Sequence, residues 1–313
     1  MRSSHLLFSS CLLAFSNALL AAPPLAYVPN EKTASISVID TQTDRKLNDI
    51  VVGQRPRGGA TDGKRLYLTD AKAGKLLVVE VASGKLLRSV TLGDSPEGIS
   101  LSANGKLIAV AVEDDNSVVL LSAPEGRELA RIKVQGRNPE HAVFSPDGRW
   151  LYVSAEEAEQ VDVVDVAARK QVASVEVGKR PRGIGFLPDG SRAYVACELA
   201  GKVYAIDVAS RKVVAEIAAG QYPNGIAVDP AGQRVYVSNG RDASVMAIDT
   251  ASHAVVASVE VGKRPWNMAL TPDGAKLYVA NGRSNSVSVI DTASFKVQGT
   301  IEVGELPWGV SIR

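Results

Sequence analysis

A proline recurs along this chain of 313 residues at a nearly constant spacing, and this repeat constrains the fold more than any other feature. Its positions are Pro56, Pro96, Pro139, Pro181, Pro223, Pro265 and Pro307, with steps of 40, 43, 42, 42, 42 and 42 residues. Such a period indicates a supersecondary unit that buries its apolar face against copies of itself. Length alone would favour about two domains. Because no linker interrupts the period, we expect a single domain over residues 23–313.

The last complete unit reads as four short strands separated by turns. Its first apolar run, 267–270, ends in the Thr-Pro-Asp-Gly turn of residues 271–274, where proline presets φ and glycine takes a position that needs positive φ. Residues 276–280 form a second apolar run, residues 286–290 alternate small polar residues with Val or Ile, and residues 296–303 complete the unit. Four antiparallel strands with short loops at this period predict a β-propeller blade.

The two ends of the chain each carry part of a further unit. The complete units start near Pro56, Pro96, Pro139, Pro181, Pro223 and Pro265. Residues 25–53 contain the later strands of another unit, and residues 305–313 match a first strand with nothing after it. We expect these segments to pair, because closing the ring removes the open sheet edges of a linear array. The sequence therefore predicts an all-β fold, a seven-bladed β-propeller of four-stranded antiparallel blades.

Residues 1–22 have the layout of a secretory signal peptide. Arg2 is followed by a charge-free apolar stretch, and small residues precede Pro23, so we expect cleavage near residues 18–22. A retained membrane anchor is the alternative, although the stretch is short and is interrupted by Ser and Asn. Cleavage would leave Cys197 as the single cysteine, so we expect no internal disulfide. The prediction is an exported, periplasmic monomer with no membrane span after cleavage.

Short motifs inside the units point to a family. Residues 27–30 (Tyr-Val-Pro-Asn), 236–239 (Tyr-Val-Ser-Asn) and 278–281 (Tyr-Val-Ala-Asn) resemble the Tyr-Val-Thr-Asn repeat of YVTN-family β-propellers. In length, leader and number of repeats, the chain is also similar to β-propeller proteins associated with quinone (PQQ)-dependent alcohol catabolism. That resemblance implies a periplasmic protein partner, namely a quinoprotein dehydrogenase, a cytochrome or a transporter component. It does not imply that this chain binds the quinone.

Charge and motif content exclude several function classes. The chain has 35 Lys+Arg and 34 Asp+Glu, a net charge of +1, which lacks the basic footprint of a nucleic-acid binder. It has no Cys-x-x-Cys-His haem attachment motif, no G-x-S-x-G elbow and no phosphate-binding glycine loop. The histidines outside the leader, His141 and His253, are far apart and belong to different parts of their units. We therefore expect no catalytic residues, no metal and no cofactor.

The loop before each first strand is the place where the units differ most. The residue after each repeat proline varies through Arg57, Glu97, Glu140, Arg182, Asn224, Trp266 and Trp308. We expect this loop and the loop between the second and third strands to lie on one face, around the mouth of the central channel. The candidate binding residues on this rim are Arg57, Glu140, His141, Arg182, Tyr222, Trp266, Asn267 and Trp308.

Each part of the rim has a binding interpretation and a structural one. The basic side chains suit a small anionic ligand or carboxylates of a partner, or they are simply solvated: Arg55, Arg57, Lys179, Arg180, Arg182, Lys263 and Arg264. Trp266 and Trp308, with Tyr222 nearby, suit a protein partner, or the indole rings cover a seam between blades. His141 and Asn267 replace the glycine of the other units and should project into the channel.

Acidic residues gather in the loops between second and third strands. Glu113-Asp114-Asp115, Glu156, Glu157, Glu159 and Glu198 form a sector that either steers a basic partner or is solvated. Together these features favour a non-catalytic binding or scaffolding propeller. The alternative is a lactonase-type propeller hydrolase at the channel mouth, for which Glu97, Glu140 and His141 are the nearby candidates.

Overall fold

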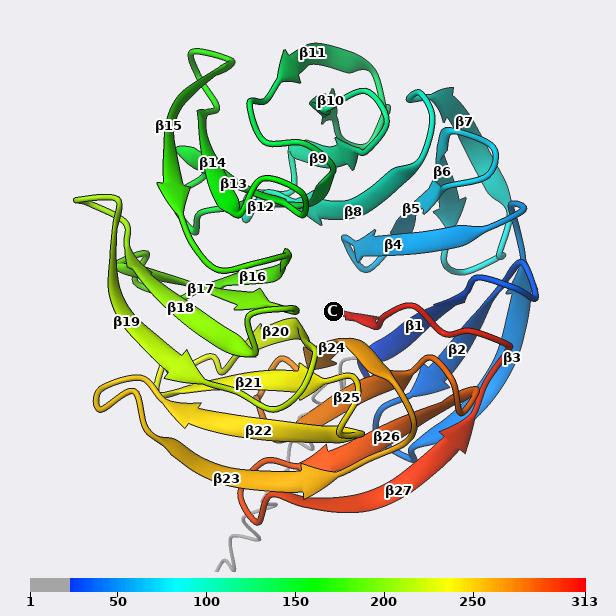
Figure 1. Ribbon diagram of the computed structural model, residues 1–313. Helices are drawn as coiled ribbons and strands as arrows, with labels where there is room; N and C mark the ends of the chain where they lie inside the picture. The colour runs from blue at the N-terminus through cyan, green and yellow to red at the C-terminus, as the bar shows by residue number, and fades with distance from the viewer. Residues whose placement is uncertain (1–22) are drawn as a thin grey trace, which may run out of the picture.

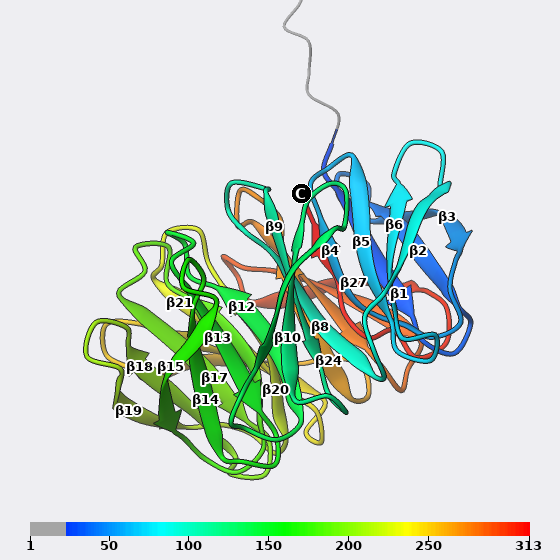
Figure 2. The same cartoon turned by 90° about the horizontal axis from the view of Figure 1, so that it is seen from above.

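The computed structural model describes residues 23–313, which form seven four-stranded antiparallel sheets around a central axis (Figure 1). This confirms the predicted seven-bladed β-propeller. Figure 2, turned by 90°, shows the twist of the sheets. The signal peptide predicted for residues 1–22 lies outside the described residues. Within residues 23–313, no helix has the length and apolar character to cross a membrane.

The strand bounds follow the sequence units closely. The first three complete blades are β4 (Pro56–Thr61), β5 (Arg65–Asp70), β6 (Lys75–Glu80), β7 (Leu86–Thr91); β8 (Pro96–Leu101), β9 (Leu107–Val112), β10 (Ser117–Ser122), β11 (Glu128–Lys133); and β12 (Pro139–Phe144), β13 (Trp150–Ala155), β14 (Gln160–Asp165), β15 (Lys170–Glu176). The next three are β16 (Pro181–Phe186), β17 (Arg192–Cys197), β18 (Lys202–Asp207), β19 (Lys212–Ala218); β20 (Pro223–Val228), β21 (Arg234–Asn239), β22 (Ser244–Asp249), β23 (Val255–Glu260); and β24 (Pro265–Leu270), β25 (Lys276–Asn281), β26 (Ser286–Asp291), β27 (Lys296–Glu302). Each first strand begins at its repeat proline.

Both ends of the chain build the remaining blade. It consists of β28 (Ser311–Ile312), β1 (Leu25–Asn30), β2 (Ser35–Asp40) and β3 (Arg45–Val51). Antiparallel pairing places Tyr27 opposite Ser311, and the Trp308 N–H donates to the Pro29 carbonyl at 2.9 Å. The predicted closure is therefore confirmed, and the closing blade has four strands like the other six.

Apolar clusters lie between neighbouring blades and hold the ring together. The tyrosine that recurs in second strands is buried in each case, as in Tyr152, whose ring meets Phe186 of the next blade at a centroid distance of 4.9 Å. Tyr278 packs in the same way against Val28 of the closing blade. The aromatic side chains thus fill the wedge between sheets, where a flat pleated surface alone would leave space.

Glycines in the first strands allow the blades to converge on the axis. A Cβ atom at Gly58 would lie 2.5 Å from the Glu97 carbonyl oxygen, and one at Gly183 would lie 2.5 Å from that of Asn224. Only glycine fits this approach without moving the next blade. Two units have His141 and Asn267 in place of this glycine. These two are therefore the exceptions that direct a side chain toward the axis.

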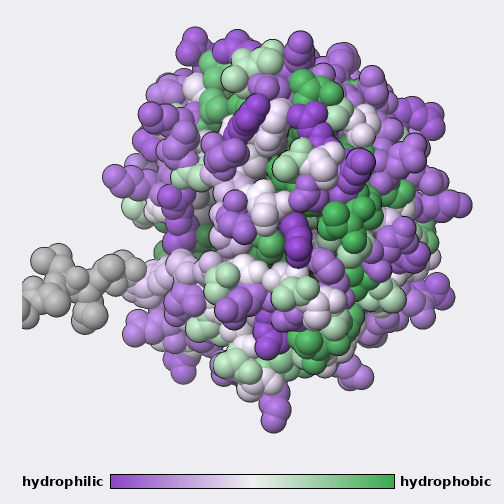
Figure 3. Space-filling view, turned by 90° about the vertical axis from the view of Figure 1, so that its left-hand side faces the viewer, coloured by the Kyte–Doolittle hydropathy of each residue, from purple (hydrophilic) through white to green (hydrophobic). Residues whose placement is uncertain are grey.

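The outer strands face solvent. Figure 3 views the molecule from the left-hand side of Figure 1 and shows a mainly hydrophilic surface with scattered hydrophobic residues. Among these exposed apolar residues, Val172 lies on β15, Val214 on β19 and Val256 on β23. Single exposed apolar residues on edge strands are ordinary, so this face does not define a site.

In five blades the third strand ends at an aspartate, whose side chain stabilises the turn that follows. The Asp249 carboxylate accepts hydrogen bonds from the Ser252 N–H at 2.8 Å and hydroxyl at 2.7 Å, and Asp291 does the same with Ser294. These local bonds lower the pKa of Asp249 and Asp291. The series of aspartates is therefore a structural turn motif.

Candidate functional site at the channel mouth

One backbone hydrogen bond joins the two loops of every blade on the same face. The carbonyl of the residue before the repeat proline accepts a bond from the N–H of the residue after the second strand, as from Glu198 to Arg180 at 2.8 Å and from Gly240 to Tyr222 at 2.7 Å. In most blades the accepting residue has positive φ, for example 58° at Arg180 and 56° at Tyr222. Because the backbone is constant, the differences between blades reside in side chains. The predicted placement of both loops on one face is confirmed.

A cavity of about 370 Å³ opens at this face, within the usual range of about 300–1,000 Å³ for a ligand pocket. The predicted site residues that line it are Arg57, Glu140, Arg182, Trp266, Asn267 and Trp308. The side chains that sequence reasoning did not assign to the site are Glu31, Glu113, Glu156, Arg180 and Arg264. Charged groups therefore dominate this cavity, which we call the mouth.

A smaller chamber of about 140 Å³ lies beneath the mouth and shares Asn267 and Trp308 with it. His141 lines this chamber, with its ring 5.5 Å from that of Trp308. His141 and Asn267 thus project toward the channel, as expected. Burial lowers the pKa of His141, and its buried Nε2 has no hydrogen-bond partner among residues 23–313. Burial therefore favours the neutral imidazole, and no side chain within residues 23–313 forms a hydrogen bond with the ring.

Tyr222 lies away from the mouth. It lines a neighbouring open groove with Lys263 and Arg283, and the guanidinium of Arg264 lies 5.3 Å from the centre of its ring. The structure therefore does not bring Tyr222 together with Trp266 and the other predicted residues around one cavity. The Tyr222 ring is held in the neighbouring groove by the guanidinium groups of Arg241 and Arg264, which lie 5.7 and 5.3 Å from the ring centre.

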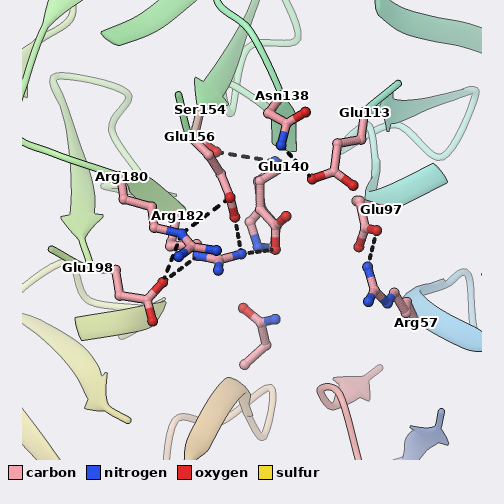
Figure 4. Close-up of polar contacts among 12 residues, drawn as sticks. Arg57, Glu97, Glu113, Asn138, Glu140, Ser154, Glu156, Arg180, Arg182 and Glu198 are labelled. Atoms are coloured by element: carbon pink, nitrogen blue, oxygen red, sulfur yellow. Dashed lines mark hydrogen bonds and ion pairs between the residues drawn. The ribbon is translucent and has the colours of Figure 1, made fainter. Parts of the chain in front are cut away.

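Arg182 is the centre of a buried ion-pair network (Figure 4). Its guanidinium contacts Glu140 at 2.8 Å, Glu198 at 2.9 Å, and Glu156. Burial opposes ionisation of Glu140 and Glu198, but the charge of Arg182 outweighs burial and lowers the pKa of both carboxyls. Arg264 adds a further contact to Glu198 at 2.6 Å. Three carboxylates, one from a first strand and two from loops after second strands, are thereby fixed around one cation.

A second network is centred on Arg57, which contacts Glu97 and lies 3.4 Å from Glu31. The Ser95 hydroxyl donates to Glu97 at 3.1 Å and is 2.9 Å from Glu113. Burial, followed by the nearby charge of Glu140, raises the pKa of Glu97 well above its usual range. The mouth thus holds one carboxyl that favours the neutral form beside one that favours the charged form.

Glu156 and Glu113 also favour protonation. Burial and the charge of Glu140 raise the pKa of Glu156 to about 7, and burial raises that of Glu113. The Asn138 amide holds the other Glu113 oxygen at 3.0 Å. Protonated carboxyls of this kind reduce the repulsion among closely spaced acids.

The basic rim and the acidic sector predicted from sequence are therefore parts of one network. Arg57 and Arg182 are neutralised by carboxylates, and Glu156 and Glu198 are buried among guanidinium groups. This corrects the expectation for Glu156 and Glu198, whereas Asp114, Glu157 and Glu159 of the acidic sector are exposed. A signal was present in the sequence: the fourth residue after the repeated Tyr/Ala slot is Glu31, Ala71, Glu113, Glu156, Glu198, Gly240 and Gly282 in the successive units.

The two tryptophans of the rim occupy different environments. Trp266 lies over Gly282, where any Cβ atom would overlap with the indole ring. Trp308 is 9% exposed and separates the mouth from the inner chamber. Trp266 therefore forms an accessible wall of the mouth, whereas Trp308 is mostly part of the channel interior.

The described residues also limit other chemistry. Within residues 23–313, no three His, Cys, Asp or Glu side chains are placed to hold a metal ion. Cys197 is buried, and burial raises the pKa of its thiol to about 12. A thiol of this kind is not a nucleophile near neutral pH.

Comparison with known proteins supports the fold and leaves the activity open. A family model described as "Lactonase, 7-bladed beta-propeller" matches residues 166–302, and one described as "Cytochrome D1 heme domain" matches residues 102–225. Each covers less than half of the chain.

The chain is 27% identical over 161 residues to the uncharacterized protein YncE of Salmonella typhimurium, which is 49% of this chain and 45% of that protein. The YncE of Salmonella typhi matches to the same extent. The match thus spans less than half the length of these relatives.

Two solved structures share the whole architecture. Hydrazine synthase of Kuenenia stuttgartiensis aligns with a TM-score of 0.78 and 25% identity over 85% of this chain and 92% of that chain. A functionally unknown protein of Desulfotomaculum acetoxidans aligns with a TM-score of 0.81 and 19% identity over 92% and 98%. These likenesses establish the fold, a seven-bladed propeller.

Proposed function

We propose that this chain is an exported, non-catalytic binding propeller of the periplasm, of the YVTN type, which binds a partner or ligand at its mouth. The observation that carries the proposal is the constant loop backbone, lined by side chains that vary between blades. A rigid frame with variable lining is how propellers and other repeat folds build specific binding surfaces. The resemblance to PQQ-associated propellers supports a role accessory to quinoprotein-dependent alcohol catabolism.

The arrangement of charges favours binding over catalysis. Glu140 is held by Arg182, and Glu97 is fully buried against Arg57 and does not line the mouth. His141 lies below them in the inner chamber, without a paired acid among the described residues. A general base needs hydrogen-bond reach to its nucleophile, and this geometry does not provide it.

The same charges favour a protein partner over a small anion. The guanidinium groups of the mouth already contact carboxylates, so a lone anion would have to separate existing ion pairs. A partner surface with both donors and acceptors, and an apolar group for Trp266, matches the lining without that cost.

A propeller hydrolase is the second candidate. It is favoured by the lactonase family match over residues 166–302 and by the opposite pKa directions of Glu97 and Glu140. Two neighbouring carboxyls with a raised and a lowered pKa are the pattern of an acid and a base. Hydrolysis of simple lactones by the purified protein, abolished by Glu97→Gln and by Glu140→Gln, would establish this candidate instead.

The haem named in the second family model does not fit the described residues. His141 is confined to a chamber of about 140 Å³, below the range of about 300–1,000 Å³ for cofactor pockets, with Trp308 beside its ring. His253 lies in a turn between β22 and β23. Neither imidazole has space for a macrocycle across its face.

The binding proposal is tested with purified partners of the classes named above. We expect a periplasmic quinoprotein alcohol dehydrogenase or its c-type cytochrome to bind the wild type in calorimetry, and Trp266→Ala to weaken binding about tenfold, as at an aromatic hot spot. Trp150→Ala is the control, because Trp150 lies between Arg149 and Arg211 and outside the mouth. Equal affinity of both variants, or no binding by the wild type, would refute the proposal.

The export proposal has its own measurement. We expect the protein expressed from its full sequence to be recovered from the periplasm with an N-terminus near residues 19–23. Recovery from the cytoplasm or the membrane with Met1 intact would contradict it.

A further inference from the structure

A basic groove lies beside the mouth, over the loops of three consecutive blades. These blades, β16–β19, β20–β23 and β24–β27, are neighbours in Figure 1. It has a volume of about 700 Å³ and is open to solvent. Its lining comes from the β17–β18, β19–β20, β21–β22, β23–β24 and β25–β26 loops. The residues that define this basic groove are Leu199, Tyr222, Arg241, Lys263, Arg264 and Arg283.

The charges of the basic groove are not neutralised internally. Its lining contains five cationic side chains and one carboxylate, Glu198, which is already shared by Arg180, Arg182 and Arg264. Within residues 23–313, the side chains of Arg241, Lys263 and Arg283 have no carboxylate within ion-pair distance. The nearby Asp242 is engaged by the backbone N–H of Gln221 at 2.6 Å. The groove is therefore a local excess of positive charge on a nearly neutral chain.

An apolar floor accompanies these cations. The Tyr222 ring lies between two guanidinium groups, 5.7 Å from Arg241 and 5.3 Å from Arg264, which fixes its orientation. Leu199 beside it is 54% exposed. An exposed leucine next to an immobilised aromatic ring provides a place for an apolar side chain of a ligand.

We propose that the basic groove binds an acidic segment of a partner protein, in which carboxylates flank an apolar or aromatic side chain. The unpaired cations would contact the carboxylates, and Leu199 and Tyr222 would contact the apolar side chain. The cations belong to loops of successive blades, so an extended chain reaches them together, whereas one compact anion contacts only some of them. This surface does not depend on occupancy of the mouth.

The proposal is tested by fluorescence anisotropy with a labelled synthetic peptide that has Asp and Glu residues on both sides of a central Phe. We expect saturable binding that weakens as NaCl is raised, because exposed charges are screened. Replacing the acids by Asn and Gln, or the Phe by Gly, should weaken binding about tenfold or more in each case. Equal binding of either control peptide would overturn the proposed chemistry.

Protein variants locate the peptide. Arg241→Glu/Arg283→Glu should abolish peptide binding without unfolding the protein, since neither side chain makes an ion pair, and Tyr222→Ala should weaken it severalfold. Lys72→Glu/Lys85→Glu is the matched control, because it reverses two other exposed cations and should leave affinity unchanged. Loss in the control variant, or retention in the groove variant, would overturn the assignment.

Competing ligands distinguish other occupants. Citrate and inorganic phosphate should displace the peptide only at concentrations where ionic strength explains the effect, and vesicles that contain phosphatidylglycerol should not bind. Stoichiometric binding of citrate alone, or binding to vesicles lost in Arg241→Glu/Arg283→Glu, would replace the proposal. The Trp266→Ala variant should bind the peptide normally, so failure here is separable from failure of the mouth proposal.

Discussion

The mouth consists of two sectors that differ at a single position of the repeat, the first residue after each second strand. The residues at this position are Glu31, Ala71, Glu113, Glu156, Glu198, Gly240 and Gly282. The N–H of each donates the same backbone hydrogen bond to the loop before the first strand. The sectors therefore differ in side chains while sharing one backbone.

In the glutamate sector Glu31, Glu156 and Glu198 contact guanidinium groups. Glu113 instead contacts Ser95 and Asn138. In the glycine sector the space is taken by the adjacent loop: Arg264 lies 3.2 Å from the Cβ position of Gly240, and Trp266 covers Gly282. Removing a carboxylate at this position thus does two things. It admits an aromatic wall to the mouth, and it leaves Arg241, Lys263 and Arg283 without carboxylate partners among the described residues, which creates the basic groove.

The largest effect is expected from Arg182→Leu, which removes the counterion of the glutamate sector. Glu140, Glu156 and Glu198 would remain buried beside one another, so the free energy of unfolding should fall by about 3–5 kcal/mol. Urea denaturation at pH 7 measures it. The matched variant is Arg283→Leu in the glycine sector, which makes no ion pair and should change stability little. Similar decreases in the free energy of unfolding for the two variants would contradict the distinction between the sectors.

The next effect is a pH dependence confined to the glutamate sector. The pKa of Glu156 rises from 4.5 to about 7 on folding, so the folded protein binds the extra proton between these values. The contribution of Glu156 to the free energy of unfolding is fully present below pH 4.5 and is lost as the pH rises through 7. Glu156→Gln should therefore reduce the fall in unfolding free energy between pH 5 and 8 by up to about 3 kcal/mol.

Denaturation curves of the wild type and Glu156→Gln at pH 5, 6.5 and 8 test this prediction. Glu140 and Glu198 do not interfere with this measurement. Folding lowers the pKa of both carboxyls, so the stability that they contribute is lost only as the pH falls below 4.5. Parallel pH profiles for the two proteins would show that Glu156 titrates normally.

A smaller effect is expected from Gly282→Ala in the glycine sector. The added methyl group overlaps with the Trp266 ring, so the ring must move, at a cost of about 1–3 kcal/mol. Tryptophan fluorescence should shift with it. Gly299→Ala is the control, because a Cβ atom there meets nothing within 4 Å. An unchanged emission spectrum for Gly282→Ala would place Trp266 elsewhere.

The smallest effect concerns an ion pair on the protein surface. Lys32 and Glu305 are 2.5 Å apart and link the two ends of the chain, but their side chains are 65% and 48% exposed. Lys32→Ala should lower the free energy of unfolding by less than about 0.5 kcal/mol. A loss comparable to that of Arg182→Leu would mean that exposed pairs matter as much as buried ones in this ring.

Sequence reasoning was accurate wherever the cause is local. The turn at residues 271–274, the strand alternation at 286–290 and the proline at the start of each first strand depend on neighbouring residues, and the structure confirms all of them. The glycine positions of the first strands were also predictable, because the repeat itself shows where two slots, His141 and Asn267, depart from glycine.

The positions of the site residues could be predicted from the sequence, but the side chains that they contact could not. Arg57, Arg182 and Trp266 were placed at the mouth, as the structure has them. The pairing of Arg57 and Arg182 with glutamates was missed because most of these glutamates lie on other blades. Tyr222 was assigned to the wrong cavity because its side-chain direction depends on Arg241 and Arg264, which reach it from loops far along the chain.

The sequence by itself determined the number of blades, the way the ring closes and the face that carries the variable loops. Those features follow from period, turn chemistry and hydrophobic alternation, which act over a few residues and repeat. Only the tertiary structure decided which charges neutralise one another. Arg182 and Glu140 are 42 positions apart, and Arg264 and Glu198 are 66 apart. Their interaction depends on distance and burial across blades, and a linear sequence does not specify either.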